Sequence, residues 1–220
     1  MRITPTPKRR NVVLDIETLS LDPTDSQGAL SAMTGRIACI GLLLDDGNSI
    51  TEESFIDEDE RGLLIQFWEH VEQTDLFVGH NVLNFDLPFI RQRSWILDVR
   101  PSRRIDLRRF YSKDLLDTMQ IWCNWGATKY PSLDGLGEVL GCGCKSGSGS
   151  NIADWWSAGN RAAIAEYCRE DVRLTYKLFC RLMFWPIPDR FAVLETISTT
   201  VVQTRGLSLD EQAAYGEIHR

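Results

Sequence analysis

Long apolar segments are missing from this chain of 220 residues. The longest apolar run, from Ile37 to Leu44, is far shorter than the ~20 residues that a membrane-spanning helix needs. Lys8-Arg9-Arg10 is followed by a short apolar run that carries acids, which is not the pattern of a secretory signal peptide. We therefore expect a cytoplasmic protein that has no contact with a membrane.

Histidines are few, and the cysteines do not have the spacing of a metal site. The chain holds three histidines and six cysteines. Cys142 and Cys144 could form half of a zinc site, but no second pair with ligand spacing follows and no histidine lies near them in sequence. Without a secretory signal, we expect reduced thiols rather than disulfides.

An excess of positive charge is also missing. The chain has 31 acidic and 24 basic residues, so the formal net charge is -7. This balance argues mildly against a nucleic-acid-binding protein that works through a broad basic surface. It leaves open an enzyme whose acids bind cations. The length suits one sizeable core with an appendage, and no internal repeat is present.

What the chain does have is an unusual strand at residues 12–18. Val12, Val13, Leu14 and Ile16 are apolar and mostly β-branched, as a buried central strand requires. Asp15 and Glu17 lie two residues apart, so their side chains leave the strand on the same face. Two carboxylates on a buried face repel each other and are costly to desolvate. A metal site would explain the arrangement.

Hydrophobic spacing predicts three meandering strands followed by alternating helices and strands. This order favours an α/β fold with a mixed β-sheet flanked by helices on both faces. We expect strands at 11–18, 36–45, 49–56 and 76–78, with a further short strand around 105–107. We expect helices at 58–74, 85–97, 115–125, 132–140 and 161–184, and two more helices within 191–220.

Two later groups supply further acids. Asp86 lies where a strand passes into a helix, and by itself it fits an acid stabilised by the helix dipole. Tyr167 and Asp171 are four residues apart in the long helix, so they share one face. That face also carries apolar residues and should be buried, and a buried aspartate needs a partner. An ordinary Tyr/Asp pair at a helix edge remains the alternative.

Taken together, these groups resemble the motifs of the DEDD superfamily of 3′–5′ exonucleases, which have a ribonuclease-H-like fold. Asp15-Ile16-Glu17-Thr18 is similar to the first motif. Asn81-x-x-x-Phe85-Asp86-x-Pro88 is similar to the second motif, in the form found in proofreading domains of family-B DNA polymerases. Tyr167-Cys168-x-x-Asp171 is similar to the third, in the tyrosine subclass called DEDDy. The resemblance covers residues 11–184, and no polymerase domain follows it.

The resemblance implies two divalent cations, Mg²⁺ or Mn²⁺, which suits a site made of oxygen ligands. Asp15 would bridge both ions, and Glu17 and Asp171 would complete the ion on the nucleophile side. Asp86 would hold the second ion, and Tyr167 would orient the attacking water. Four carboxylates need such ions, because two unit charges ~5 Å apart repel by roughly 3 kcal/mol at an effective dielectric constant of ~20.

The family also implies contacts with the substrate. Thr18 and Leu19 would hold the terminal nucleotide through backbone and an apolar wedge, and Asn81 and Phe85 would lie near the 3′ strand; Phe85 is equally expected as a core residue. Lys145 either reaches a phosphate or is a solvated loop lysine. Basic residues in the segment 100–113 favour a surface that follows phosphates, although they also fit a charged sheet edge. Four tryptophans could stack on bases but at their spacing are more often core residues: Trp122, Trp125, Trp155 and Trp156.

We predict an exonuclease domain at residues 1–188 and a helical extension at 189–220. The expected activity is hydrolysis at 3′ ends of single-stranded DNA, releasing nucleoside 5′-monophosphates. An exoribonuclease of the same fold and a catalytically silent nucleic-acid- or protein-binding module are the alternatives. The extension could contact a polymerase or another replication or repair protein, and the sequence leaves the oligomeric state open.

Overall fold

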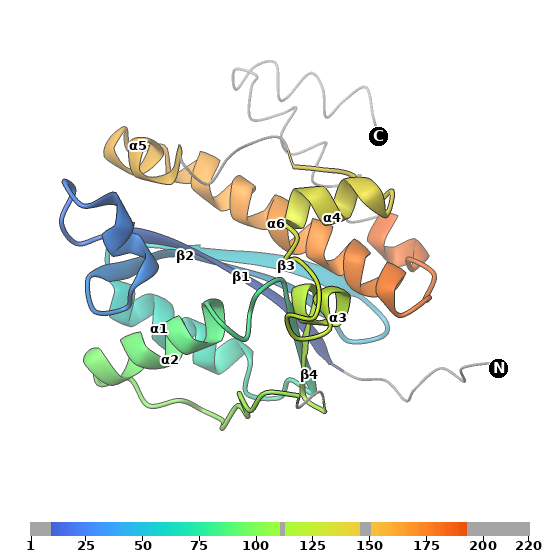
Figure 1. Cartoon of the computed structure of the whole chain (residues 1–220). Coiled ribbons are helices and arrows are strands. Elements are labelled where there is room, and N and C mark those ends of the chain that lie inside the picture. The colour runs from blue at the N-terminus through green and yellow to red at the C-terminus, as the bar shows by residue number, and fades with distance from the viewer. Residues whose placement is uncertain (1–9, 111–112, 146–150, 193–220) are drawn as a thin grey trace, which may run out of the picture.

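A five-stranded mixed sheet forms the centre of the molecule (Figure 1). The computed structural model describes residues 10–110, 113–145 and 151–192. The strand order is β3-β2-β1-β4-β5. The first three strands form an antiparallel meander, and the two short strands β4 and β5 extend it in parallel on the other side of β1. The strands are β1 (Asn11–Ser20), β2 (Gly35–Asp45), β3 (Ile50–Ile56), β4 (Leu76–Gly79) and β5 (Leu115–Asp117).

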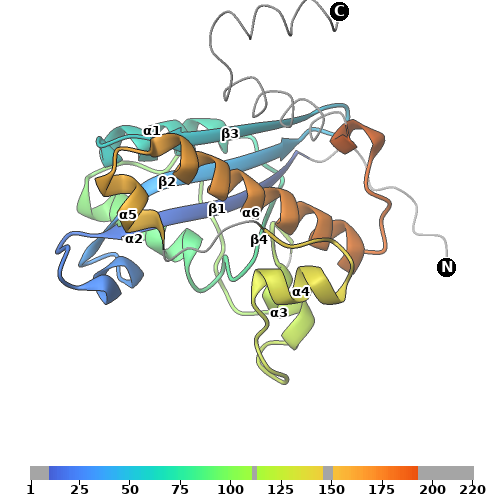
Figure 2. The ribbon, with the colours of Figure 1, turned by 90° about the horizontal axis from the view of Figure 1, so that it is seen from above.

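Helices cover both faces of this sheet. In Figure 1, α1 and α2 lie below it and the long helix α6 lies above it; Figure 2 shows α6 running across β1 and β2. The helices are α1 (Glu60–His70), α2 (Asp86–Ile96), α3 (Thr118–Cys123), α4 (Leu133–Val139), α5 (Ile152–Ser157) and α6 (Arg161–Leu182), with a 3-10 helix η1 (Ser26–Leu30). The predicted fold class is confirmed.

The side chains of β1 alternate between the two layers. Leu14 and Ile16 pack with α1 and α2, whereas Val13 packs with Val172 and Tyr176 of α6. Both faces of β1 are therefore covered, which explains its near-continuous apolar sequence. The same alternation places residues 13, 15, 17 and 19 on the side of α6.

One predicted strand is wrong, and one was missed. Residues 105–107 form no strand; Ile105 and Leu107 pack as irregular chain against the core beneath α1 and α2. The strand is β5 (Leu115–Asp117), where we had predicted the first turn of a helix. That helix, α3, starts only at Thr118, because the side chain of Asp117 caps it by accepting hydrogen bonds from Met119 N and Gln120 N. The short helices η1 and α5 were not predicted.

The end of the described chain is fastened to the core. Phe191 is fully buried and its ring stacks on Tyr176 at a centroid distance of 5.1 Å. Arg190 pairs with Asp45 of β2, which also accepts a hydrogen bond from the hydroxyl of Tyr176. Residues 190–191 thus contact the core beyond the predicted boundary at 188. Most of the two predicted tail helices lies outside the described residues.

No helix in the described parts of the chain is both long enough and apolar enough to span a membrane. The six cysteines, all of which lie in those parts, are free thiols.

Candidate active site

Asp15 and Glu17 point from β1 toward helix α6, as their spacing predicts. The thiol of Cys168 on α6 lies 3.6 Å from Asp15 Oδ2 and 3.5 Å from Asp15 O. Gly41, the partner of Asp15 in strand β2, makes this approach possible. A Cβ atom at Gly41 would lie 2.7 Å from Cys168 Sγ and 3.2 Å from Cys168 O, so a larger residue would push the helix away. Glycine therefore sets how close α6 comes to the two acids.

Asp86 approaches the same point from the turn between β4 and α2. It is the first residue of α2 and is only 3% exposed. Its Oδ1 accepts a hydrogen bond of 3.0 Å from the backbone amide of Ile16, the residue between the two acids of β1. This bond fixes the carboxylate beside Asp15 and Glu17.

Asp117 holds that turn in place. Its carboxylate accepts hydrogen bonds from the backbone amides of Asn81 at 3.0 Å and Leu83 at 3.1 Å, in addition to the two amides of α3. Asn81 has a positive φ of 65°, a conformation that asparagine tolerates better than most residues. With four amides on its oxygens, Asp117 acts as an anchor for the turn.

Tyr167 and Asp171 complete the group from α6. Both are 5% exposed, and the helix face that carries them also buries Ile164 and Leu178, as the spacing predicts. Asp171 Oδ1 is buried and has no hydrogen-bond partner among the described residues. A buried carboxylate oxygen without a partner is costly, and a cation would relieve that cost.

Lys145 lies between these two side chains. Its ammonium group donates a hydrogen bond to the hydroxyl of Tyr167 and another, of 2.9 Å, to Asp171 Oδ2. It also lies 4.5 Å from the centre of the Tyr167 ring. The side chain is 14% exposed, so Lys145 is not a solvated loop lysine. The backbone amide of Lys145 donates a hydrogen bond of 2.9 Å to Asp134 Oδ1, which fixes the loop at this residue.

Burial raises the pKa of all four acids, and neighbouring carboxylates add to the effect. Burial, followed by the charges of Asp171 and Glu17, raises the pKa of Asp15 well above its usual range, and burial does the same for Glu17. Burial raises the pKa of Asp86 to about 7 and that of Asp171 to about 6, although Lys145 opposes the second shift. A raised pKa means that the charged form of a carboxylate is disfavoured, so additional positive charge would stabilise these groups.

Burial raises the pKa of Tyr167 to about 12, against the opposing hydrogen bond from Lys145. Burial alone would lower the pKa of Lys145, but its hydrogen bonds to Tyr167 and Asp171 and the charge of Asp171 raise it instead. At neutral pH the tyrosine is therefore a neutral hydroxyl and the lysine a cation.

The donor set fits a hard divalent cation. Among the described residues, Asp15, Glu17 and Cys168 each place one potential ligand atom within 4.8 Å of the others. The two carboxylates and the unpartnered oxygen of Asp171 suit Mg²⁺ or Mn²⁺. The thiol of Cys168 stays protonated, because its hydrogen bond with Cys39 and its burial raise its pKa well above normal. Cys142 and Cys144 belong to no such group in the described residues.

The predicted substrate residues surround the acids but differ in accessibility. The hydroxyl of Thr18 donates to Ala29 O at 2.7 Å, and Leu19 is buried against α6. Asn81 Oδ1 accepts a hydrogen bond from the side-chain amide of Asn84. Phe85 is half-buried, and the centre of its ring lies 5.5 Å from that of Phe89. The roles of Thr18, Leu19, Asn81 and Phe85 in substrate binding stay predictions.

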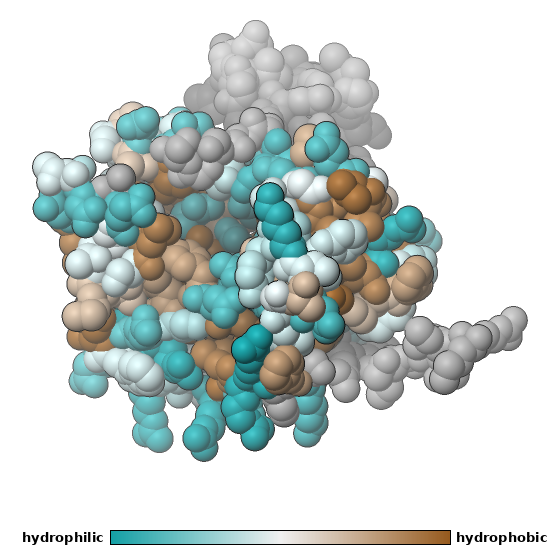
Figure 3. Space-filling view, in the orientation of Figure 1, coloured by the Kyte–Doolittle hydropathy of each residue, from teal (hydrophilic) through white to brown (hydrophobic). Residues whose placement is uncertain are grey.

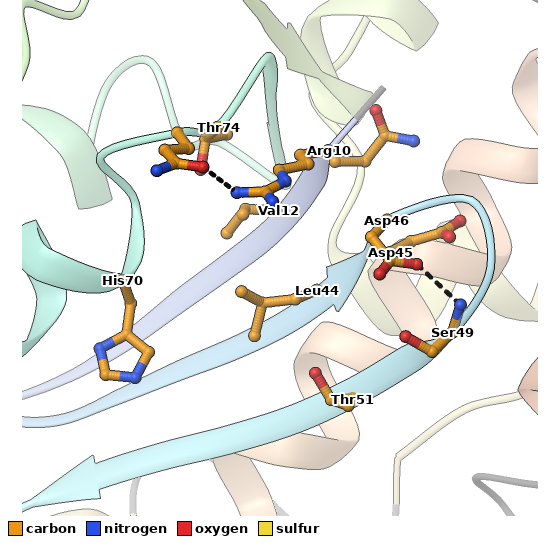
Figure 4. A pocket seen from close by; sticks show the side chains of 11 residues that line it. Arg10, Val12, Leu44, Asp45, Asp46, Ser49, Thr51, His70 and Thr74 are labelled. Carbon is orange, nitrogen blue, oxygen red and sulfur yellow. Dashed lines mark hydrogen bonds between the residues drawn. The ribbon is translucent and has the colours of Figure 1, made fainter. Parts of the chain in front are cut away.

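A separate hollow of about 200 Å³ lies at the N-terminal end of β1, beside Arg10, Asp45 and His70 (Figure 4). None of the predicted site residues lines it. It is therefore not part of the candidate active site.

Comparison with known proteins identifies the family of the chain. Residues 30–191 match the model of a family described as a predicted 3′–5′ exonuclease related to the exonuclease domain of PolB. The chain belongs to this family. The matched range contains Asp86, Lys145, Tyr167 and Asp171 and begins after Asp15 and Glu17. The resemblance predicted from the motifs is confirmed.

A solved structure shows the same fold. The family B DNA polymerase from the hyperthermophilic archaeon Pyrobaculum calidifontis is similar to 80% of the chain, with a TM-score of 0.62 and 21% identity. The match takes in 25% of the polymerase, so the chain spans about a quarter of that protein's length. No curated protein matches the chain.

Proposed function

We propose that this protein is a metal-dependent 3′–5′ exonuclease that acts on single-stranded DNA. The observation that carries the proposal is the meeting of acids from β1, α2 and α6 around one point, with a tyrosine and a lysine beside them. This is the residue order of the DEDDy motifs on the fold of a polymerase exonuclease domain. The catalytic residues would be Asp15, Glu17, Asp86, Tyr167 and Asp171.

The four carboxylates would hold two divalent cations, Mg²⁺ or Mn²⁺. When bound, such ions polarise the attacking water and the scissile phosphate and neutralise charge at the leaving oxygen. The raised pKa values of Asp15, Glu17 and Asp86 support this assignment, because these groups are short of positive charge.

Tyr167 would position the attacking water. With its pKa raised to about 12, it is protonated at neutral pH and is not suited to act as the general base. Its oxygen accepts a hydrogen bond from Lys145, which leaves its own proton to be donated to the water or to a phosphate oxygen. Lys145 would then bring its charge to the scissile phosphate, while Asp171 keeps the ammonium group in place.

Thr18, Leu19, Asn81 and Phe85 would contact the terminal nucleotides, and cleavage would release nucleoside 5′-monophosphates. DNA is favoured because the second motif has the form found in DNA polymerase exonuclease domains. An exoribonuclease remains the alternative, since no side chain that reads a 2′-hydroxyl is identified in residues 10–110, 113–145 and 151–192. A partner polymerase or repair protein at residues 189–220, and a cytoplasmic location, likewise remain predictions.

A labelled oligonucleotide tests the activity. With Mn²⁺ or Mg²⁺, the wild-type protein should shorten a 5′-labelled single-stranded DNA from its 3′ end, as a ladder on a gel. Asp15→Ala should abolish cleavage, and Tyr167→Phe should slow it by about 10²-fold, the loss expected when a reacting group is misplaced by about 1 Å. Asp154→Ala, which removes an exposed acid on α5, is the matched control and should cleave normally. Full activity in Asp15→Ala would disprove the proposal.

Comparing the cleavage rates of DNA and RNA oligonucleotides of the same sequence decides between a DNA exonuclease and an exoribonuclease. Thermal melting decides against a silent module: millimolar Mn²⁺ should raise the melting temperature of the wild type and not that of Asp15→Ala. No shift in the wild type would count against any nuclease function.

A further inference from the structure

A second hollow lies beside the candidate active site and has no part in the proposed chemistry. It has a volume of about 280 Å³ and lies where the turn between β4 and α2 faces helix α3 and the loop that follows α3. We call it the α3 hollow. Its lining residues are Leu83, Asn84, Leu107, Arg109, Gln120, Trp125 and Tyr130.

The lining is chemically suited to a nucleobase. Trp125 and Tyr130 offer aromatic faces, Arg109 offers a guanidinium group, and Asn84 and Gln120 offer amides that can both donate and accept hydrogen bonds. None of these lining residues is acidic. Gln120 is 4% exposed and its Oε1 accepts a hydrogen bond from the Cys123 thiol, so this amide is held in a fixed position. Aromatic, cationic and amide groups together are what single-stranded nucleic acids meet in their binding proteins.

The loop that presents Trp125 is held in a strained conformation. Asn124, Trp125 and Gly126 follow one another with positive φ values of 46°, 60° and 90°. For a residue as bulky as tryptophan this backbone conformation is a clear outlier, and such outliers persist only where the surroundings enforce them. Figure 2 shows the loop after α3 projecting from the body of the molecule.

Contacts from the segment before β5 enforce that conformation. Arg109 donates a hydrogen bond of 2.8 Å to Trp125 O, and the ring of Phe110 meets the indole at 4.9 Å in an edge-on arrangement. Phe110 itself has a positive φ of 67°. Two strained segments are thus fastened together at the rim of one hollow, which is typical of functional sites rather than of loops that only connect elements.

The α3 hollow and the acids share a wall. Leu83 and Asn84 belong to the turn that leads to Asp86. Asp117, which caps the helix α3 that contains Gln120, accepts a hydrogen bond from the backbone amide of Leu83. A strand with its 3′ end at the acids therefore has the α3 hollow within its reach.

We propose that the α3 hollow receives a base of the single-stranded substrate upstream of the nucleotide that is cleaved, and so helps to select single strands. This inference rests on the proposed exonuclease function. The base stacks on Tyr130 and Trp125, Arg109 contacts a neighbouring phosphate, and Asn84 contacts the base edge. Stacking needs an unpaired base, so a paired 3′ end loses this contact.

The test separates stacking from general binding. Tyr130 is 52% exposed, so Tyr130→Ala can be made without disturbing the core. The substrates are single-stranded DNA oligonucleotides with one abasic site, moved stepwise from the 3′ end. In the wild type, one upstream position should raise KM by about 10-fold, as the loss of one base-stacking contact does. In Tyr130→Ala, KM should be raised for the intact strand, and an abasic site at that position should raise KM by much less than in the wild type.

Two variants serve as controls. Tyr130→Phe keeps the ring and should resemble the wild type. Trp95→Ala removes an aromatic side chain that is 65% exposed on α2 and pairs with Arg91, away from the α3 hollow; it should leave KM unchanged. Arg109→Ala should raise KM and reduce its dependence on salt, since one phosphate contact is lost.

The outcomes are distinguishable from failure of the proposed function. If the wild type cleaves and Tyr130→Ala has the same KM for every oligonucleotide, the α3 hollow binds no base and the exonuclease proposal stands. If the wild type cleaves nothing, the proposed function fails. Fluorescence anisotropy with the intact and abasic strands in chelator then tests base binding in the α3 hollow. Equal affinity of wild type and Tyr130→Ala overturns the proposal, and a position-specific loss of affinity that is larger in the wild type than in Tyr130→Ala supports it.

Discussion

At the scale of single residues, the contacts of Lys145 with Tyr167 and Asp171 are the main feature of the site that the sequence does not predict. Its ammonium group is the cation that Asp171 contacts directly in the described structure. Neither the loop sequence around it nor its distance of 22 residues from Tyr167 indicates this contact. The faces of Asp15, Glu17, Tyr167 and Asp171 could be predicted because strand alternation and the i,i+4 rule fix them, whereas a lysine side chain on a loop has no such periodicity.

We predict that Lys145→Met lowers kcat by about 10²-fold, comparable to the loss of one charge-stabilising donor. The variant should also be less stable in chelator by ~1–3 kcal/mol, because Asp171 loses a buried hydrogen-bonding partner. Lys145→Arg keeps the charge and should recover part of both losses. Normal activity in Lys145→Met would show that the lysine is only a structural neighbour of Asp171.

Asp15 should have opposite effects on stability with and without metal. Asp15→Asn removes one buried charge from a crowded group, so in chelator at pH 9 it should raise the melting temperature by a few degrees, where ~1 kcal/mol corresponds to 2–4 °C. With millimolar Mn²⁺ the order should reverse, because the variant lacks a ligand that stabilises the bound form. Melting curves that keep the same order in both buffers would contradict this reading.

At the scale of elements, the contact between β2 and α6 sets the geometry. We predict that Gly41→Ala costs ~1–3 kcal/mol, the usual range for overpacking, and lowers activity by moving Tyr167 and Asp171 away from β1. Cys168→Ala in the same chain removes the nearest clash and should restore part of the stability, measured by urea unfolding. The carbonyl oxygen of residue 168 stays close, so the rescue should be incomplete.

The errors in the predicted elements have one physical cause. Alternating apolar residues at 105 and 107 look like a strand, yet they are irregular chain whose side chains fill gaps in the core. β5 has only three residues, too few for a period to be detected, and it passes directly into a helix. Short elements are fixed by their tertiary contacts, whereas β1 and α6 are long enough for their own periodicity to decide.

The end of α6 offers a second test at this scale. Phe191→Ala should cost ~3–5 kcal/mol, as loss of a buried phenylalanine does, because its ring is enclosed against Tyr176. Phe184→Ala is the matched control: that ring is 89% exposed and its loss should change stability by less than ~0.5 kcal/mol. Equal effects would mean that residues 189–192 do not belong to the folded core.

At the scale of the whole molecule, the grouped acids make stability depend on pH. The folded pKa values of about 7 for Asp86 and about 6 for Asp171 exceed the value of ~4 of an unfolded aspartate. Between pH ~4 and ~7 the folded, metal-free protein therefore binds more protons than the unfolded chain, so its free energy of unfolding falls as pH rises. In chelator, the melting temperature of Asp86→Asn should fall less steeply from pH 5 to pH 8 than that of the wild type. Parallel slopes would contradict the raised pKa of Asp86.

Hydrophilic and apolar side chains occupy different parts of the molecular surface. Hydrophilic side chains project from the lower edge of the molecule, where residues 98–110 run, and apolar side chains gather on the face between α2 and the upper helices (Figure 3). Arg103, Arg108 and Arg109 in this segment each contact other groups of the protein. These internal contacts fix the segment, and of the three arginines only Arg109 lines the α3 hollow.

The position of α6 in the chain has a consequence for synthesis. The helix brings Tyr167 and Asp171, and through Cys168 it lies against Asp15, more than 150 residues earlier. A ribosome releases β1 long before it releases α6. Because the site stays incomplete until Tyr167 and Asp171 of α6 have been synthesised, we expect an unfinished chain to be unable to cut nucleic acid. This includes the messenger RNA from which the chain is being translated.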